Sequence, residues 1–179
     1  MKYAAFLSGI NVGKRRVKMP VLAEVFEELG HQNVATFIAS GNVIFQSNKR
    51  KQSLIEDNAG DALRQRLGYE VNVFVRSFDD LKTIANAETL DEHESGQSTI
   101  NVAFMRNELD AKTADKLESV RTEHDSFRVI GREFYWICTT RISESKVWAL
   151  PETKSIQLPR NTVRNITTIR RLVSKFFTD

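Results

Sequence analysis

The chain has 179 residues, of which 41% are hydrophobic and 27% are charged, and its formal net charge is only +3. These values are typical of a globular protein of one domain or two small ones. The single cysteine, Cys138, excludes an internal disulfide and favours a reducing cytoplasm. No apolar run reaches membrane-spanning length, so we expect a cytoplasmic protein with no membrane partner.

Apolar alternation and helical spacing predict six elements in the first half of the chain. They are a strand at 3–7, a helix at 19–30, strands at 34–39 and 43–45, a helix at 55–67 and a strand at 71–75. This order is that of a ferredoxin-like βαββαβ unit. A short helix is predicted at 78–84, and the acidic, polar stretch 87–98 is predicted to be a linker.

The second half repeats this order. We predict a strand at 100–105, a helix at 111–120, strands at 127–130 and 133–138, a helix at 143–150 ending near Pro151, an irregular or short strand segment at 158–163 and a final helix at 166–177. The predicted fold class is therefore α+β, with two ferredoxin-like units that arose by duplication. We expect mainly antiparallel sheets with helices on one face. The predicted domains are 1–86 and 99–179, the second including the C-terminal helix.

Glycines, an asparagine and four cations fill the segment between the first strand and the first helix. The cations are Lys14, Arg15, Arg16 and Lys18. In a split βαβ unit the end of the first strand and the hairpin turn share one sheet edge. We therefore expect this loop to lie beside the turn at 40–42, where the positive end of the following helix would favour an anion.

A structural interpretation of the same residues stands beside the functional one. Gly41 is typical of a hairpin turn, Asn11 could satisfy loop backbone, and the cations could be a solvated loop. The pattern Gly9-x-x-x-Gly13-Lys14 is not a P-loop, because the glycine spacing is one residue short and Arg15 stands where Ser or Thr is needed.

Three sequence motifs carry a family resemblance. They are Leu-Ser-Gly-Ile-Asn-Val-Gly at 7–13, Val-Lys-Met at 17–19 and Ser-Gly-Asn-Val-Ile-Phe at 40–45, with fainter matches at 75–76, 145–146 and 164–165. Together they closely resemble the signatures of the bacterial domain-of-unknown-function 1697 family. The resemblance implies a duplicated ferredoxin-like fold and no established activity. The chain departs from the family pattern at Ser8, Lys14 and Ile166, where Arg, Gly and Trp are common.

The first functional hypothesis is that a small phosphorylated or otherwise anionic ligand binds in a cleft between the two units. The expected ligand-binding residues are Gly9, Asn11, Gly13, Lys14, Arg15, Ser40, Gly41, Asn42, Lys146, Arg164 and Asn165. A second hypothesis is a transferase or hydrolase acting on a phosphate-bearing substrate, for which no catalytic residue is identified. A third is nucleic-acid binding through the basic C-terminal helix.

Other candidate residues favour structural roles. His31, His93 and His124 lack a second ligand at metal-binding spacing, so we expect neither a metal site nor a cofactor. Strand alternation puts Trp136 and Cys138 on one face, which predicts a buried structural thiol and an aromatic side chain packed in the core.

Overall fold

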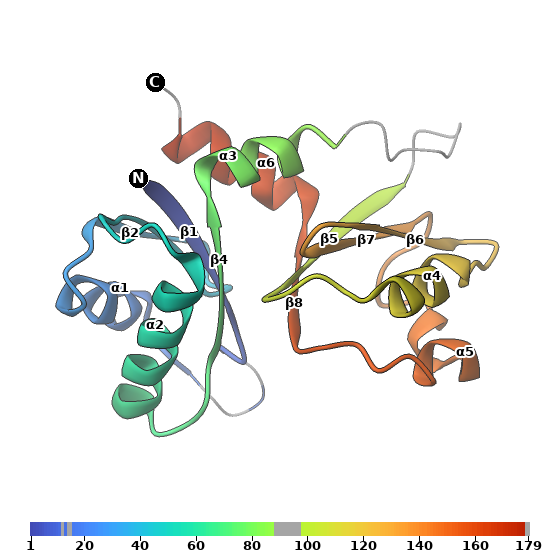
Figure 1. Cartoon of the computed structure of the whole chain (residues 1–179), viewed down its shortest axis with the longest axis horizontal. Helices are drawn as coiled ribbons and strands as arrows, with labels where there is room; N and C mark the ends of the chain where they lie inside the picture. The colour runs from blue at the N-terminus through green and yellow to red at the C-terminus, as the bar shows by residue number, and fades with distance from the viewer. Residues whose placement is uncertain (12, 14–15, 88–97, 178–179) are drawn as a thin grey trace. The chain divides into compact units, whose positions relative to one another are not determined.

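The computed structural model describes residues 1–11, 13, 16–87 and 98–177, which form two four-stranded antiparallel sheets (Figure 1). The strand order is β2-β3-β1-β4 in the first sheet and β6-β7-β5-β8 in the second. The predicted α+β class is confirmed, and the repeated strand order is consistent with duplication.

Each unit begins with a strand at the centre of its sheet. The first comprises β1 Lys2–Ser8, α1 Met19–Glu28, β2 Gln32–Phe37, β3 Asn42–Gln46, α2 Gln52–Leu67 and β4 Asn72–Ser77, followed by α3 Phe78–Ala85. The second comprises β5 Thr99–Met105, α4 Ala111–Ser119, β6 Asp125–Ile130, β7 Glu133–Cys138, the 3-10 turn η2 Val147–Ala149, α5 Pro151–Lys154 and β8 Asn161–Asn165, followed by α6 Ile166–Phe176. A helix after the fourth strand is thus part of both repeats.

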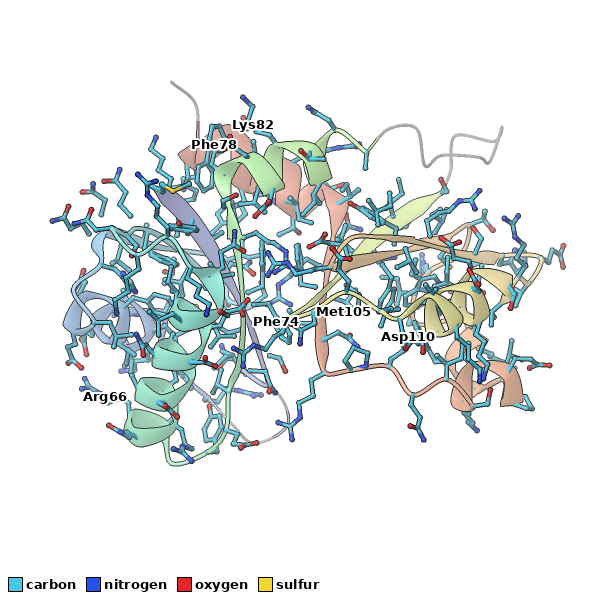
Figure 2. All side chains as sticks on the ribbon, in the orientation of Figure 1. Arg66, Phe74, Phe78, Lys82, Met105 and Asp110 are labelled. Atoms are coloured by element: carbon cyan, nitrogen blue, oxygen red, sulfur yellow. The ribbon has the colours of Figure 1, made fainter. Side chains whose placement is uncertain are left out.

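Helices α1 and α2 cover one face of the first sheet (Figure 1). Alternation in β1 turns Tyr3, Ala5 and Leu7 toward this face, where they join a core that includes Phe26 of α1 and Leu63 of α2. Arg66 of α2, labelled in Figure 2, also forms hydrogen bonds with carboxylates of α1, at 2.7 Å to Glu24 and 3.2 Å to Glu28. The apolar core and this charged contact hold the helix pair together.

The core of the second unit is built from the corresponding strand positions. Ala103 and Met105 of β5 pack with Phe134 and Trp136 of β7 and with Leu117 of α4. Cys138 is buried in this core, as predicted. Trp136 is buried too, and its indole Nε1 donates a 2.7 Å hydrogen bond to Asp125, as expected for an aromatic side chain in the core.

The segment predicted as a helix at 143–150 has a different structure. It contains a turn and then the 3-10 turn η2, and Pro151 begins α5 instead of ending a helix. Proline suits a first helical turn because its missing N–H is not needed there. The Ser145 hydroxyl donates to Asp125 at 2.8 Å and accepts the N–H of Val147, which favours a turn at this point over a continuous helix.

Contacts divide the chain into two compact units, one of residues 1–83 with the C-terminal residues from 171, the other of residues 84–170. The prediction assigned the whole final helix to the second unit, whereas contacts group its last turns with the first. Within that first unit Phe176 meets Phe37 edge-on at 5.8 Å, and Phe177 stacks on Phe78 at 4.9 Å. The predicted linker at 87–98 falls mostly outside the described residues.

Candidate functional site

The loop that follows β1 has an unusual backbone. Gly9, Asn11 and Gly13 have positive φ angles of 79°, 57° and 61°, so every second residue is left-handed. Glycine adopts this conformation readily, and asparagine is among the few other residues that tolerate it. Where left-handed residues alternate with right-handed ones, neighbouring backbone N–H groups turn toward a common point, which is one way that anion-binding concavities are built.

Asn11 fixes the shape of this loop. Its side-chain Nδ2 donates to the carbonyl of Ala39 at 3.2 Å, and its Oδ1 accepts the N–H of Val17 at 2.7 Å. The first bond ties the loop to the β2–β3 turn, so the two segments lie side by side, as the sheet topology requires. Because both side-chain groups bind backbone, Asn11 positions the loop and is not expected to contact a ligand through its amide.

The β2–β3 turn is held equally firmly. Gly41, at φ 74°, accepts the N–H of Leu7 at 2.8 Å. A Cβ at this position would lie 3.1 Å from the Cβ of Leu7, so only glycine fits without displacement. Asn42 is fully buried and donates to the Phe37 carbonyl at 3.0 Å and to the Ser40 hydroxyl at 2.9 Å. Its amide, like that of Asn11, is used internally.

One cation of the loop is fixed against its backbone. The Nη1 of Arg16 donates to the carbonyl of Gly13 at 2.9 Å and, at a longer 3.5 Å, to that of Asn11. The sequence placed four cations here but could not show which one the loop would hold, because this contact depends on two carbonyls turned by left-handed residues. Lys14 and Arg15, named as ligand-binding residues from the sequence, lie outside the described residues.

The loop also offers backbone donors. Within the described part of the chain, the N–H groups of Gly9, Ile10 and Asn11 have no hydrogen-bond acceptor. A donor without a partner is tolerated where water or a ligand can reach it, and Asn11 and Gly9 are partly exposed. The same loop thus carries unpaired backbone donors and a guanidinium fixed on its Gly13 carbonyl, and both kinds of group suit an oxyanion.

The three predicted residues of the second unit lie in different places. Lys146 lines a cavity of about 380 Å³ that also contacts Asp125 and Glu144. Arg164 and Asn165 are consecutive on β8, where they pair with Val102 and Asn101 and so face opposite sides of the sheet. Arg164 donates to the Thr162 hydroxyl at 2.8 Å, and burial lowers the pKa of its guanidinium to about 10.

The other reactive groups have structural surroundings. Burial is the main cause that raises the pKa of the Cys138 thiol, which lies 3.3 Å from the Thr140 carbonyl. A raised pKa disfavours the nucleophilic thiolate. Across residues 1–87 and 98–177, with their short gaps, no group of three or more His, Cys, Asp or Glu is placed to hold a metal ion. In the same residues no helix is long and apolar enough to cross a membrane.

Comparison with known proteins identifies a protein of the same fold and the family to which the chain belongs. The fold is that of a conserved bacterial protein, SP0830 from Streptococcus pneumoniae, with a TM-score of 0.72, 22% sequence identity and coverage of 97% of this chain and 98% of that one. Residues 1–135 match the family described as "Protein of unknown function (DUF1697)". The chain belongs to this family, as its motifs indicated. No curated protein matches it.

Proposed function

We propose that this chain is a cytoplasmic protein that binds a small phosphorylated or otherwise anionic ligand at the loop 9–13 and the adjacent turn 40–41. The observation that carries the proposal is the alternation of left-handed residues at Gly9, Asn11 and Gly13. Asn11 and Gly41 support it by holding the loop and the turn together. A site built this way is rigid before the ligand arrives, which lowers the cost of binding.

Electrostatics supports the same choice. The guanidinium of Arg16 is tied to the loop by its bond to the Gly13 carbonyl, so its charge stays within the loop that also carries the unpaired N–H groups. Charge-assisted hydrogen bonds are roughly twice as strong as neutral ones. The helix α1 begins nearby at Met19, and its cap residue Lys18 provides no side-chain hydrogen bond to the first turn. The positive end of this helix therefore adds to the attraction for an anion.

The experiment is a phosphate titration of the ¹⁵N-labelled full chain at constant ionic strength, followed by amide chemical shifts. We expect the amides of Gly9, Ile10, Asn11 and Gly41 to shift with one common dissociation constant. Arg16→Gln removes the fixed charge and is expected to weaken this binding about tenfold. Lys18→Gln is the matched control, because it removes an equal charge from an exposed side chain nearby and so measures the long-range part of the attraction alone.

A second variant tests the two cations whose placement is not described. Lys14→Ala combined with Arg15→Ala is expected to weaken phosphate binding further, because long-range attraction adds to the fixed contact. The proposal is wrong if the loop amides do not respond to phosphate. It is equally wrong if Arg16→Gln titrates like the native protein, since the loop would then be a solvated turn shaped by its glycines.

A separate observation favours nucleic-acid binding as a second candidate function. Arg171 and Lys175, both exposed on α6, lie 5.6 Å and 5.9 Å from the ring centre of Phe37. Among the residues with described positions, no carboxylate pairs with either cation. Two unneutralised cations held side by side suit neighbouring phosphates of a single strand.

The salt dependence of binding to a single-stranded oligonucleotide tests this candidate. If both cations contact phosphates, Arg171→Gln with Lys175→Gln is expected to reduce the log–log salt slope by roughly 1.4. Lys112→Gln with Lys116→Gln on α4 is the control with the same loss of charge. An unchanged slope in the α6 variant, or the same reduction in the α4 variant, excludes a specific role for the final helix.

A further inference from the structure

A second polar cavity lies wholly within residues 84–170. It has a volume of about 410 Å³ and is formed where β5 begins and where β8 passes into α6. Its lining includes Thr99, Asn165, Thr167 and Arg170. No carboxylate belongs to this lining among the residues the structure describes. The volume falls in the range of small-molecule sites.

Arg170 supplies the only charge among these lining residues, and its orientation is fixed. Its Nε donates a 2.9 Å hydrogen bond to the carbonyl of Ala85, the last residue of α3. Its Nη groups have no acceptor in the described part of the chain. A guanidinium held through Nε still presents donors in a planar fork, which is the geometry that carboxylate and phosphate oxygens match.

Asn165 adds a donor whose direction is set by the helix start. Its Oδ1 accepts the N–H of Thr167 at 2.8 Å, so the amide is oriented with its Nδ2 toward other partners. Nδ2 has no acceptor among the described residues. Because this bond uses the N–H of Thr167, the charge of the cavity comes from Arg170 rather than from the helix terminus. The hydroxyls of Thr99 and Thr167 complete a lining rich in donors.

We propose that this cavity binds an oxyanion carried on a small hydroxylated molecule, such as a phosphate ester of a polyol. Arg170 and Asn165 would bind the oxyanion, and the threonine hydroxyls would bind the remainder. The volume exceeds what a bare phosphate fills, which favours a larger ligand over the free ion. This site shares no residue with the loop at 9–13 and does not depend on the function proposed there.

Amide shifts of the ¹⁵N-labelled full chain test the proposal with two probes, orthophosphate and glycerol 3-phosphate, at constant ionic strength. Glycerol 3-phosphate is expected to shift the amides of Thr99, Ile100 and Thr167 and to bind there more tightly than orthophosphate. Arg170→Gln is expected to weaken this binding about tenfold or more, and Arg170→Lys less, because lysine keeps the charge without the fork. Lys154→Gln, which removes an equal charge from an exposed side chain of α5 in the same unit, is expected to bind like the native protein.

The outcomes distinguish binding in this cavity from binding at the loop 9–13. Loss of the Thr99 and Thr167 shifts in Arg170→Gln alone, with the remaining spectrum unchanged, supports the cavity. Equal binding by Arg170→Gln and the native protein overturns it, and equal affinity for the two probes overturns the hydroxylated part of the ligand. Shifts confined to Gly9, Ile10 and Asn11 would reject the cavity while supporting the loop. Thr167→Val provides a second variant if Arg170→Gln does not fold, and it is expected to weaken glycerol 3-phosphate binding selectively.

Discussion

The strands β1 and β5 occupy the same position in two sheets of the same strand order, yet the loops that follow them differ in length and conformation. After β1, residues 9–18 lead to α1 through three left-handed residues, Gly9, Asn11 and Gly13. After β5, residues 106–110 lead directly to α4, and Asp110 caps this helix by accepting the N–H of Thr113. The longer loop forms the candidate site, whereas the shorter one only starts a helix.

The hairpins opposite these loops differ in a similar way. The N–H of Leu7 bonds to Gly41 at 2.8 Å, and that of Met105 bonds to Arg132 at 3.0 Å, so the connection is the same. The next position of the hairpin pairs Asn42 with Phe6 in the first unit and Glu133 with Phe104 in the second. An amide in one unit thus stands where the other has a carboxylate. The backbone pairing is repeated in the two units, whereas the side chains at this end of the sheet differ.

The fourth strands each carry an arginine at the same register position. Arg76 pairs with Ala4 of β1, and Arg164 pairs with Val102 of β5. Ala4 and Val102 hold the same position in their strands, because Ala5 and Ala103 follow them. Arg76 is fully buried, 3.9 Å from the buried carboxylate of Glu56, whereas Arg164 is half-buried and bonds to Thr162 and Val163. The four predictions below compare residues of the two units.

The largest difference is expected between Arg76→Met and Arg164→Met. Losing Arg76 removes the buried cation that lies 3.9 Å from the Glu56 carboxylate, which is expected to lower the free energy of unfolding by about 3–5 kcal/mol. Arg164→Met removes hydrogen bonds from a partly exposed group, with an expected loss of about 1–2 kcal/mol. Urea unfolding measures both. Adding Glu56→Gln to Arg76→Met is expected to restore part of the loss, and equal losses at the two arginines would contradict the comparison.

The next difference is expected between the two hairpin glycines. Gly41→Ala puts a Cβ 3.1 Å from Leu7 and 3.2 Å from Ile10, in addition to the strain of its positive φ. We expect a loss of about 2–4 kcal/mol. Gly131→Ala meets nothing closer than 3.9 Å, so its cost of about 1–2 kcal/mol comes from φ alone. Thermal unfolding of the two variants would disprove this account if Gly131→Ala were the less stable one.

A pH-dependent difference is expected between the histidines of the two units. His31 is buried between Phe26 and Phe45, and burial, helped by Lys49, lowers its pKa below the usual 6.5. Below pH 6.5 the unfolded chain therefore binds more protons than the folded one, so stability falls as the pH drops toward the folded pKa, and it does not change above this window. His31→Gln is expected to flatten melting temperature between pH 7.5 and about 5. His124→Gln, which changes an exposed histidine of the second unit, is the control.

The smallest difference is expected at the helix starts. Asp110→Ala removes the cap of α4 and is expected to lower the melting temperature slightly (Figure 2 labels Asp110). Hydrogen bonds from Thr113 lower the pKa of Asp110, so the effect is expected above the usual aspartate pKa and to disappear as the pH falls through the lowered value. Lys18→Ala, at the corresponding cap of α1, makes no side-chain cap bond and is expected to cost nothing. A lower melting temperature for Lys18→Ala would contradict this comparison, because it would mean that the Lys18 side chain stabilises the start of α1.

The sequence was sufficient to predict the sheets, and it left open which side chains of the candidate sites the fold holds in place. Alternation such as Tyr3, Ala5 and Leu7 predicts strands because a strand that faces a core on one side leaves this trace locally. Arg16 and Arg170 leave no such trace, since each is fixed by a carbonyl that only the folded chain brings to it. The helix predicted at 143–150 was wrong for the same reason, because the turn found there depends on contacts that only the folded chain makes. Val147 and Leu150 have helical spacing, but the bonds of Ser145 to Asp125 and Val147 favour a turn.

The discontinuity of the first unit has a consequence for synthesis on the ribosome. Residues 84–170 form a continuous unit and emerge complete, whereas the first unit needs residues from 171 onward. Until those residues emerge, Phe37 and Phe78 lack the rings of Phe176 and Phe177 that cover them. The half of the protein that is translated first is therefore completed only when residues from 171 onward have emerged, and until then two of its aromatic rings lack their packing partners.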